Sequence, residues 1–251
     1  MQLHVSVWGS GDLPRSAVLL HGVTSNSESW VRVGPALAEL GYRAYAPDLR
    51  GHGTSPKSDG HYQLAELLGD LVESLPVAPD LLIGHSFGGV LATLGAASGQ
   101  LRPAHLVLED PVLVFVDREL PARLLATDEA TLPRDVDGTM RANPRWTRAD
   151  AEGKVASLKQ LDWGHMRQVF ADNAPWDVRT TLVAVAERIP TLLILPEASF
   201  YVPPDDAQRL EQSLGPGQVV RLPGTGHSVH RDDLAGYLDV ITHWIETTGV
   251  A

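Results

Sequence analysis

The sequence predicts an α/β fold in which a mostly parallel sheet carries helices on both faces. Short apolar runs alternate along the chain with stretches whose apolar residues recur at helical spacing. Some runs, such as Leu81-Leu82-Ile83, are continuously apolar, as strands buried on both faces are. At 251 residues, the chain is long enough for one such domain with a sizeable core.

Seven short apolar runs are the expected strands of this sheet, and helices are expected between them. The strands are predicted over residues 3–8, 17–20, 43–46, 81–83, 105–108, 191–195 and 219–222. The helices are predicted over residues 30–40, 63–74, 87–97 and 232–247. In the last of these, apolar residues from Leu234 to Ile245 are spaced to form one face. Asp205 and Asp206 are typical of an exposed helix start.

Residues 115–188 interrupt this alternation, because they contain helical patterns and no convincing strand. Thr147, with Asp150 three residues later, is the expected N-cap of one of these helices. We therefore expect a main body built from residues 1–114 and 189–251, with residues 115–188 forming a small helical lid.

The lid segment is rich in large apolar side chains. We expect them to line a pocket for the substrate, and the alternative is that they attach the lid to the main body. The residues are Phe115, Trp146, Trp163, Met166 and Trp176.

Composition excludes several classes of function. The net charge of −11 argues against nucleic acids and anionic membranes as partners, because both require basic patches. The absence of cysteine excludes disulfides and thiolate metal sites. No apolar run approaches the ~18 residues of a membrane span, and the first residues lack the pattern of a signal peptide. We therefore expect a soluble, cytoplasmic protein whose partner is a small-molecule substrate.

The strongest motif is GHSFG at positions 84–88, which fits G-x-S-x-G and lies between a buried strand and a helical pattern. A serine on such a sharp turn is exposed at the edge of the sheet, and the glycines relieve crowding of the backbone. The N-terminus of the helix that follows favours negative charge at the serine. The pattern predicts that Ser86 is a catalytic nucleophile.

Two further stretches complete this chemistry. His21-Gly22-Val23 follows an early strand, and we expect the backbone N–H groups of Val23 and Phe87 to form an oxyanion hole. His227 lies in a glycine-rich stretch between the last strand and the last helix, where it can serve as the base for Ser86. His230 is close by, but the pair lacks carboxylate or cysteine neighbours, so we expect no metal.

A third polar stretch contains Asp48, Arg50 and His52 after the strand expected over residues 43–46. These residues are chemically able to take part in catalysis. The prediction is instead that Asp48 and Arg50 hold their own loop in place, and that the glycines at 51 and 53 allow its tight path.

With these motifs in this order, the chain resembles the α/β-hydrolase fold family over essentially its whole length. The resemblance rests on His21-Gly22, on PDLRGHG at 47–53, on GHSFGG at 84–89 and on Gly226-His227. It implies a mostly parallel sheet of the eight-stranded type, with residues 115–188 as a cap inserted after the sixth strand. Ser86, at the sharp turn of GHSFG, differs from the aspartate that haloalkane dehalogenases and most epoxide hydrolases of this family carry there.

The resemblance leaves the acid of the triad open. Its usual place follows the strand that the family counts as seventh, expected here over residues 191–195, and this place holds Ser199. Some family members instead carry the acid at the end of the strand that the family counts as sixth. That strand, expected over residues 105–108, ends here in Glu109 and Asp110. Because side chains of a strand alternate between its faces, only one of the two can point toward His227. Asp110 is favoured, and Glu109, Glu197 and a dyad without an acid remain as alternatives.

The expected activity is hydrolysis of an ester or lactone of a mainly apolar, neutral small molecule, with no cofactor. Ser86 attacks the carbonyl, His227 accepts its proton and passes it to the leaving alcohol, and a carboxylate orients His227. Related triads also cleave carbon–carbon bonds of diketones or act as cofactor-free perhydrolases. A receptor for small molecules on the same fold is the alternative outside catalysis.

Overall fold

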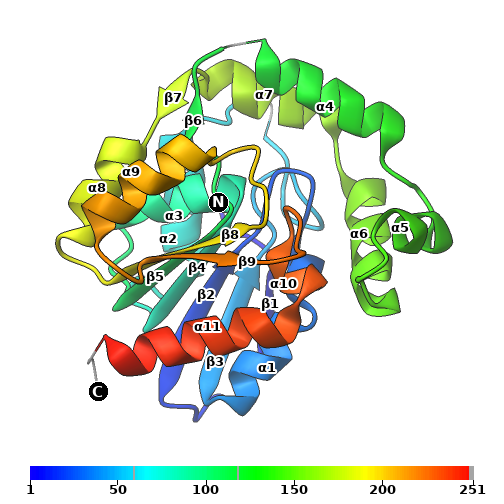
Figure 1. The fold of residues 1–251 in the computed structure, drawn as a ribbon. Coiled ribbons are helices and arrows are strands. Elements are labelled where there is room, and N and C mark those ends of the chain that lie inside the picture. Colours follow the sequence, from blue (N-terminus) through cyan, green and yellow to red (C-terminus); the bar gives the residue numbers. More distant parts are fainter. Residues whose placement is uncertain (59, 118, 249–251) are drawn as a thin grey trace.

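The computed structural model describes residues 1–58, 60–117 and 119–248, and its centre is one twisted sheet (Figure 1). Seven strands of the described residues form this sheet, in the order β1-β3-β2-β4-β5-β8-β9, so the expected eight-stranded type is corrected to seven. β1 is antiparallel to β3, and the other neighbours are parallel. The strands are β1 (Val5–Trp8), β2 (Arg15–Leu20), β3 (Tyr42–Pro47), β4 (Leu81–His85), β5 (His105–Glu109), β8 (Thr191–Pro196) and β9 (Val219–Leu222).

All seven expected apolar runs are confirmed as strands of this sheet. The three strands with continuous apolar runs, β4, β5 and β8, are buried at every position. They are covered on both faces, as a parallel sheet requires. Because β4 lies in the middle of the sheet, the turn that follows it opens at the centre of the carboxyl edge.

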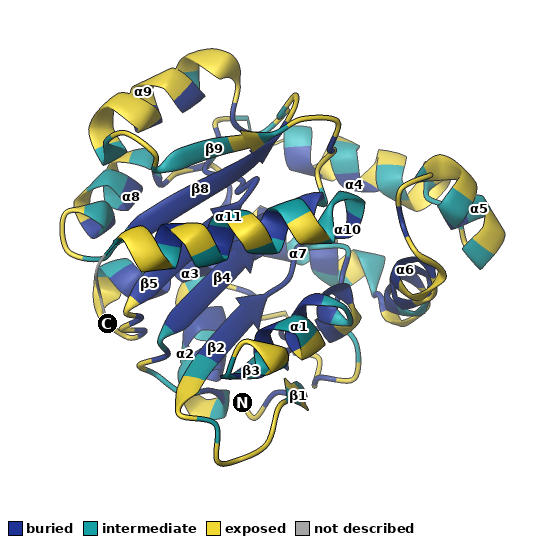
Figure 2. Cartoon of the chain, turned by 60° about the horizontal axis from the view of Figure 1, so that its bottom comes forward, coloured by how far each residue is buried: buried dark blue, intermediate teal, exposed yellow. Residues whose placement is uncertain are grey.

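Two sets of helices cover the two faces of the sheet, and their exposed sides face outward (Figure 2). Side chains of α1 and α11 pack on one face, and side chains of α2, α3, α8 and α9 pack on the other. α11 buries Tyr237, Ile241 and Trp244, as its apolar spacing predicts. The helices are α1 (Val33–Glu39), α2 (Leu64–Ser74), α3 (Phe87–Ser98), α8 (Arg179–Ala186), α9 (Pro204–Leu214), α10 (Val229–Asp232) and α11 (Leu234–Thr247).

Four helices rise from the sheet and arch over its carboxyl edge (Figure 1). The predicted N-cap at Thr147 is confirmed, because its side chain and that of Asp150 cap α6 reciprocally. α6 packs against a short 3₁₀ helix, η1 (Ser27–Trp30), in the main body. The arching helices are α4 (Leu120–Thr131), α5 (Val136–Ala142), α6 (Arg148–Gln160) and α7 (Trp163–Asn173).

A short two-stranded ribbon connects this cap to the main body. β6 (Val114–Phe115) pairs antiparallel with β7 (Trp176–Asp177), which corrects the expectation of helices alone in residues 115–188. A strand of two residues is too short to produce an alternating pattern. α8 also falls within residues 115–188, and it packs against α3 and α9.

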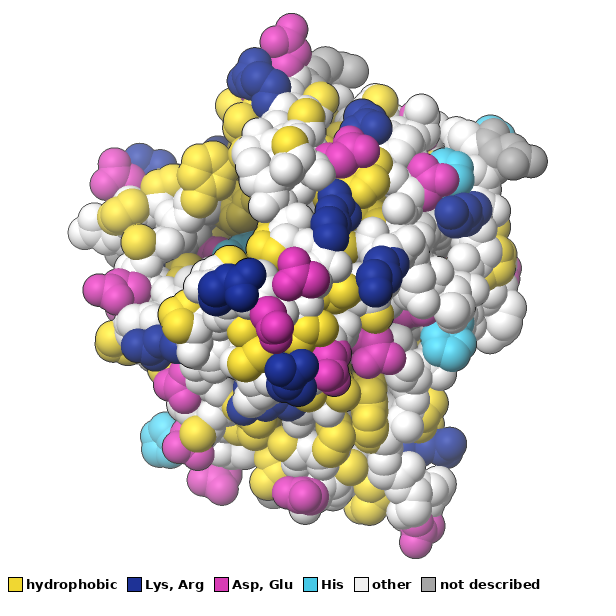
Figure 3. Space-filling view, turned by 90° about the vertical axis from the view of Figure 1, so that its right-hand side faces the viewer, with side chains coloured by type: hydrophobic (Ala, Val, Ile, Leu, Met, Phe, Trp, Pro, Cys, Tyr) yellow, Lys and Arg dark blue, Asp and Glu magenta, His cyan; other side chains and the backbone are white. Residues whose placement is uncertain are grey.

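The surface over α5, α6 and α10 shows acidic and basic side chains interspersed with apolar ones (Figure 3). No helix in the described part of the chain is both long and apolar enough to cross a lipid bilayer.

The turn between β4 and α3 is packed too closely for side chains at its glycines. A Cβ atom at Gly84 would lie 2.6 Å from the carbonyl oxygen of Gly88. A Cβ atom at Gly88 would collide with the carbonyl group of Leu20 in β2. The glycines of GHSFG are therefore required for α3 to approach the sheet.

We predict that Gly88→Ala lowers the free energy of unfolding by about 1–3 kcal/mol, because the clash is with backbone atoms that cannot rotate away. Gly69→Ala is the matched control: Gly69 lies within α2 and a Cβ atom there meets nothing within 4 Å. That change should raise the free energy by roughly 0.5–1 kcal/mol. Denaturant titration of both variants measures the difference, and equal effects would contradict the account.

Candidate active site

Ser86 occupies a strained backbone position at the turn between β4 and α3. Its φ is 55° and its ψ is −117°, a conformation that non-glycine residues rarely adopt. Neighbouring backbone fixes this turn through two hydrogen bonds. The N–H of Ser86 donates to the carbonyl oxygen of Glu109 at 3.0 Å, and the carbonyl oxygen of Ser86 accepts from the N–H of Val112 at 3.2 Å. Strain of this kind is maintained only where the surroundings impose it, and it is concentrated at functional sites.

The loop after β2 approaches Ser86 closely. A Cβ atom at Gly22 would lie 3.1 Å from Ser86 Cβ and 3.4 Å from Ser86 Oγ, so a glycine suits this position. Val23 follows, and together with Ser86 and Phe87 it lines one cavity. Phe87 is the first residue of α3, so its N–H has no partner within the helix. The structure thus brings together the two residues predicted for the oxyanion hole.

Asp48, Arg50 and His52 brace the loops around this point. The Asp48 carboxylate accepts hydrogen bonds from the backbone N–H of Ser27 at 2.8 Å and of Thr54 at 2.9 Å. Arg50 makes a two-pronged ion pair with the buried Asp70, at 2.6 and 2.9 Å. His52 Nε2 lies 2.8 Å from the carbonyl oxygen of Val23, which secures the loop that carries Val23 N–H.

Asp110 lies beside His227 at the carboxyl end of β5. The distance between His227 Nδ1 and Asp110 Oδ2 is 2.6 Å. The carboxylate is almost fully buried at 2% exposure, whereas the His227 side chain is 40% exposed, so the second ring nitrogen stays accessible. Asp110 has a φ of 37°, and its N–H donates to the carbonyl oxygen of Ile194 in β8 at 2.9 Å.

Ser199 contacts the same carboxylate from the loop after β8. Its hydroxyl donates a hydrogen bond to Asp110 Oδ1, and it accepts one from the backbone N–H of Val202 at 2.8 Å. Both oxygens of Asp110 are therefore engaged, one by Ser199 and the other by His227. The residue at the family's usual acid position thus supports the carboxylate on the neighbouring strand.

Glu109 and Glu197, the other two candidate acids, point elsewhere. Glu109 is fully buried and lies 2.8 Å from Nδ1 of His230. Burial alone would raise the pKa of Glu109, but the neighbouring His230, which also donates hydrogen bonds to the carboxylate, lowers that pKa to about 2. Glu197 Oε2 accepts from the backbone N–H of Gly224 at 2.8 Å. Of the three carboxylates, Asp110 is the one placed at His227.

His85 is a residue of this site that was not predicted from the sequence, although it occupies the first variable position of G-x-S-x-G. Its ring centroid lies 4.7 Å from that of His227, and its Nε2 lies 2.9 Å from the His227 carbonyl oxygen. Burial lowers the pKa of His85 well below its ordinary value, so the ring is neutral and donates through Nε2. The residue before Ser86 therefore fixes the backbone that carries His227.

Comparison with known proteins places the chain in a family. The model of the alpha/beta hydrolase family matches residues 17–240. The chain belongs to that family. The sn-1-specific diacylglycerol lipase ABHD11 of Mus musculus is 26% identical over 255 residues, which cover 94% of this chain and 82% of the lipase. Lipase LipV of Mycobacterium tuberculosis is 32% identical over 165 residues, which cover 64% of this chain and 62% of LipV.

Solved structures show the same fold. An esterase from Exiguobacterium antarcticum matches this alpha/beta hydrolase with a TM-score of 0.75, over 97% of this chain and 95% of the esterase, at 17% identity. The thioesterase domain from the curacin biosynthetic pathway matches with a TM-score of 0.71, over 95% of this chain and 94% of that domain, at 23% identity.

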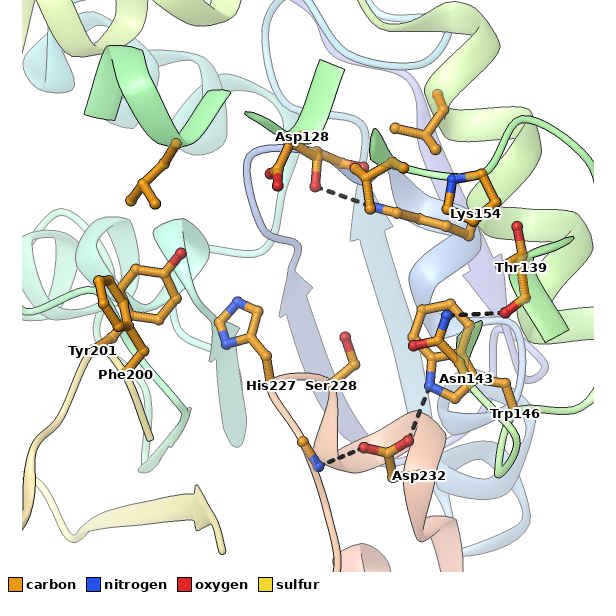
Figure 4. Close-up of a pocket in the computed structure, with 16 residues that line it drawn as sticks. Asp128, Thr139, Asn143, Trp146, Lys154, Phe200, Tyr201, His227, Ser228 and Asp232 are labelled. Atoms are coloured by element: carbon orange, nitrogen blue, oxygen red, sulfur yellow. Dashed lines mark hydrogen bonds between the residues drawn. The ribbon is translucent and has the colours of Figure 1, made fainter. Parts of the chain in front are cut away.

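Two cavities adjoin the site of this alpha/beta hydrolase, between the main body and the cap. The narrow one, of about 30 Å³, includes Ser86, Val23 and Phe87. The wide one, of about 440 Å³, includes His227 and Ser228 (Figure 4). The two share a boundary formed by Leu124, Asp128 and Tyr201.

The aromatic residues expected to line the substrate pocket divide into two groups. Phe115 lines the narrow cavity and Trp146 lines the wide one. Trp163, Met166 and Trp176 line neither cavity, so for these three the alternative of packing describes what the structure shows.

Each of the three has a partner within the cap or its base. Trp176 stacks on Phe170, and its Nε1 donates to the Val112 carbonyl oxygen at 2.9 Å. Met166 is fully buried in the core cluster that includes Phe170. The guanidinium of Arg134 lies 5.3 Å from the Trp163 ring centroid.

Charged residues of the cap that were not predicted from the sequence line the wide cavity. Lys154 in α6 donates to the carbonyl oxygen and the hydroxyl of Thr24, at 2.8 and 2.9 Å. Burial lowers the pKa of Lys154 to about 7, with a smaller contribution from the charge of Arg231. Burial also raises the pKa of Asp128, in α4. The helical spacing of the sequence gives no sign that either side chain faces a cavity.

The low pKa of Lys154 predicts a rise of stability with pH. In the unfolded chain this amine has a pKa near 10.4, so between pH 7 and pH 9 the unfolded state holds a proton that the folded state has released. Over this range the free energy of unfolding of the wild type should increase by about 2 kcal/mol relative to Lys154→Met.

The measurement is denaturant unfolding of both proteins at pH 7 and pH 9, so that every other titrating group cancels in the comparison. A difference between wild type and variant that stays constant with pH would show that Lys154 keeps its ordinary pKa in the fold.

Proposed function

We propose that this protein is a serine hydrolase that cleaves carboxylic esters with the triad Ser86, His227 and Asp110. The observation that carries the proposal is the 2.6 Å contact between His227 Nδ1 and Asp110. With Nδ1 held by the carboxylate, Nε2 is the ring nitrogen left to accept a proton from Ser86. The strained backbone of Ser86, at the end of β4, supports its assignment as the nucleophile.

In the proposed reaction, Ser86 Oγ attacks the ester carbonyl while His227 Nε2 accepts its proton. The carbonyl oxygen becomes an oxyanion, and the N–H groups of Val23 and Phe87 stabilise it. As the tetrahedral intermediate collapses, His227 donates the proton to the leaving alcohol, and the acyl group remains on Ser86. Water activated by His227 then releases the acid.

Asp110 contributes in two ways to this sequence of steps. Its hydrogen bond fixes the tautomer and the orientation of the His227 ring, and its negative charge stabilises the imidazolium that forms twice in each cycle. The carboxylate is buried, so the surrounding medium screens its charge less than water does. Every catalytic group comes from the chain, so no cofactor is required.

Ester hydrolysis is favoured over the other reactions expected for such a triad because of the relatives. Two of them carry lipase in their names, and a structural neighbour is an esterase. Lipases act on carboxylic esters, and the acyl-enzyme route described above requires no further group. No feature of the cavities favours carbon–carbon cleavage, lactone opening or perhydrolysis.

We predict that a fluorophosphonate probe labels the protein at Ser86 alone, because a base-activated serine attacks phosphorus as it attacks a carbonyl. Ser86→Ala should abolish both the labelling and the hydrolysis of p-nitrophenyl acetate. Ser213→Ala is the control, since this serine in α9 is exposed and, among the described residues, its hydroxyl bonds only to the carbonyl oxygen of Arg209.

Peptide mapping of the labelled protein and a spectrophotometric assay make the measurement. Probe attached at another serine, or full activity in Ser86→Ala, would disprove the assignment of Ser86 as the nucleophile. A protein that binds small esters without turning them over would instead be a receptor.

A further inference from the structure

The two cavities meet near the proposed triad, because one includes Ser86 and the other includes His227. The narrow cavity contains Ser86 and the two oxyanion residues, so the acyl part of an ester occupies it. The wide cavity contains His227, which delivers the proton to the leaving oxygen, so the alcohol part extends there. This assignment rests on the proposed function, and it allows each half of the substrate to be deduced separately.

The narrow cavity sets the size of the acyl group. Its volume of about 30 Å³ holds only about two water-sized spheres, at roughly 10–15 Å³ for each. Val112, Phe115 and Leu125 line it, and all three are buried in the core. Protein interiors are packed closely, so lengthening the acyl chain requires these side chains to move. The structure therefore favours a short acyl group such as acetyl.

The wide cavity sets the chemistry of the alcohol. Its volume of about 440 Å³ lies within the range of small-molecule sites, about 300–1,000 Å³. Asp128 and Lys154 lie on the side of this cavity opposite Asp232 and Ser228, with His227 between the two sides (Figure 4). The residues that line it therefore include one acid and one base from the cap, set among apolar side chains such as Leu124, Leu132 and Leu158.

Both of these charged groups have hydrogen-bonding capacity to spare. In its protonated form, which about half of the molecules hold at pH 7, Lys154 uses two of its three N–H donors on Thr24. No described carboxylate lies within ion-pair distance of it. Within the described residues, no side chain or backbone group donates to the Asp128 carboxylate. A buried or half-buried charge is costly when its hydrogen-bonding capacity is not filled, so a ligand that supplies hydrogen bonds to both groups is favoured.

The pairing of opposite charges selects a neutral, hydroxylated alcohol. An anionic alcohol would be repelled by Asp128, and a cationic one by Lys154. A hydroxyl group can donate to the carboxylate and accept from the amine, so neighbouring hydroxyls satisfy both. We propose that the preferred substrates are short-acyl esters of polyhydroxylated alcohols, whose free hydroxyl groups bind Asp128 and Lys154 in the wide cavity.

The test compares two acetate esters that differ only in hydroxyl groups, glyceryl 1-monoacetate and propyl acetate. The wild type should show a kcat/KM at least about tenfold higher for the glyceryl ester. Asp128→Ala and Lys154→Met should each lower the ratio of the two kcat/KM values about tenfold, the scale of one hydrogen bond to a charged group. Glu129→Ala is the matched control on α4, because Glu129 is exposed and pairs with Arg167 outside both cavities.

A second comparison tests the acyl side. With p-nitrophenol as the constant leaving group, kcat/KM should fall at least about tenfold from the acetate to the octanoate, because the longer chain would have to displace a packed wall. Asp128→Ala keeps the test of the alcohol side valid if Lys154→Met does not fold, since the Asp128 side chain makes no hydrogen bond within the described residues.

Three results would overturn the inference. If Asp128→Ala left the ratio of the two kcat/KM values unchanged, the wide cavity would not bind the alcohol part. If kcat/KM were higher for the octanoate than for the acetate, the narrow cavity would not limit the acyl group. In both cases, continued ester hydrolysis would leave the proposed function intact. If the wild type cleaved none of the four esters and Ser86 took up no probe, the proposed function and the inference would fail together.

Discussion

The hydrogen bond between Asp110 and His227 is the interaction on which the arrangement of the site depends. It joins the end of β5 to the loop after β9, two segments separated by β8 in the sheet. The left-handed backbone of Asp110, with a φ of 37°, turns the carboxylate over the edge of the sheet, and the carbonyl of Ile194 holds the turn in place. Ser199 hydrogen-bonds to the second oxygen, so the loop after β8 helps to hold a carboxylate that lies at the end of β5.

Two consecutive carboxylates at the tip of β5 produce two histidine–carboxylate pairs that face opposite ways. Asp110 pairs with His227 at the cavity, and Glu109 pairs with His230 in the interior. His85 lies between them, with its ring centroid 4.7 Å from that of His227 and 5.4 Å from that of His230. The inner pair is completely enclosed, which assigns it to support of the loop that carries His227.

The sequence predicts the main body well because its signals are local. Continuous apolar runs such as residues 81–83 can be buried only in a covered sheet, and GHSFG requires a strand before it and a helix after it. The choice between Glu109 and Asp110 depends on the register of β5 against β8, which is a long-range property. The alternation of side chains along a strand could show only that one of the two carboxylates must point away from His227. The packing of the cap onto the main body determines whether Trp176 lines a cavity or packs against Phe170. It also determines whether Lys154 faces solvent or a cavity, and no periodic pattern in the sequence encodes this packing.

Turnover of p-nitrophenyl acetate by Asp110→Asn tests the central claim, the relocated acid, most directly. The amide preserves the shape of the carboxylate but removes its charge and disturbs the tautomer of His227, so kcat should fall by about 10⁴-fold. Glu197→Gln, which alters the exposed carboxylate that bonds to Gly224, should retain nearly all activity, and circular dichroism should show both variants folded. Near-normal turnover in Asp110→Asn, together with a collapse in Glu197→Gln, would contradict the account and return the acid to the loop after β8.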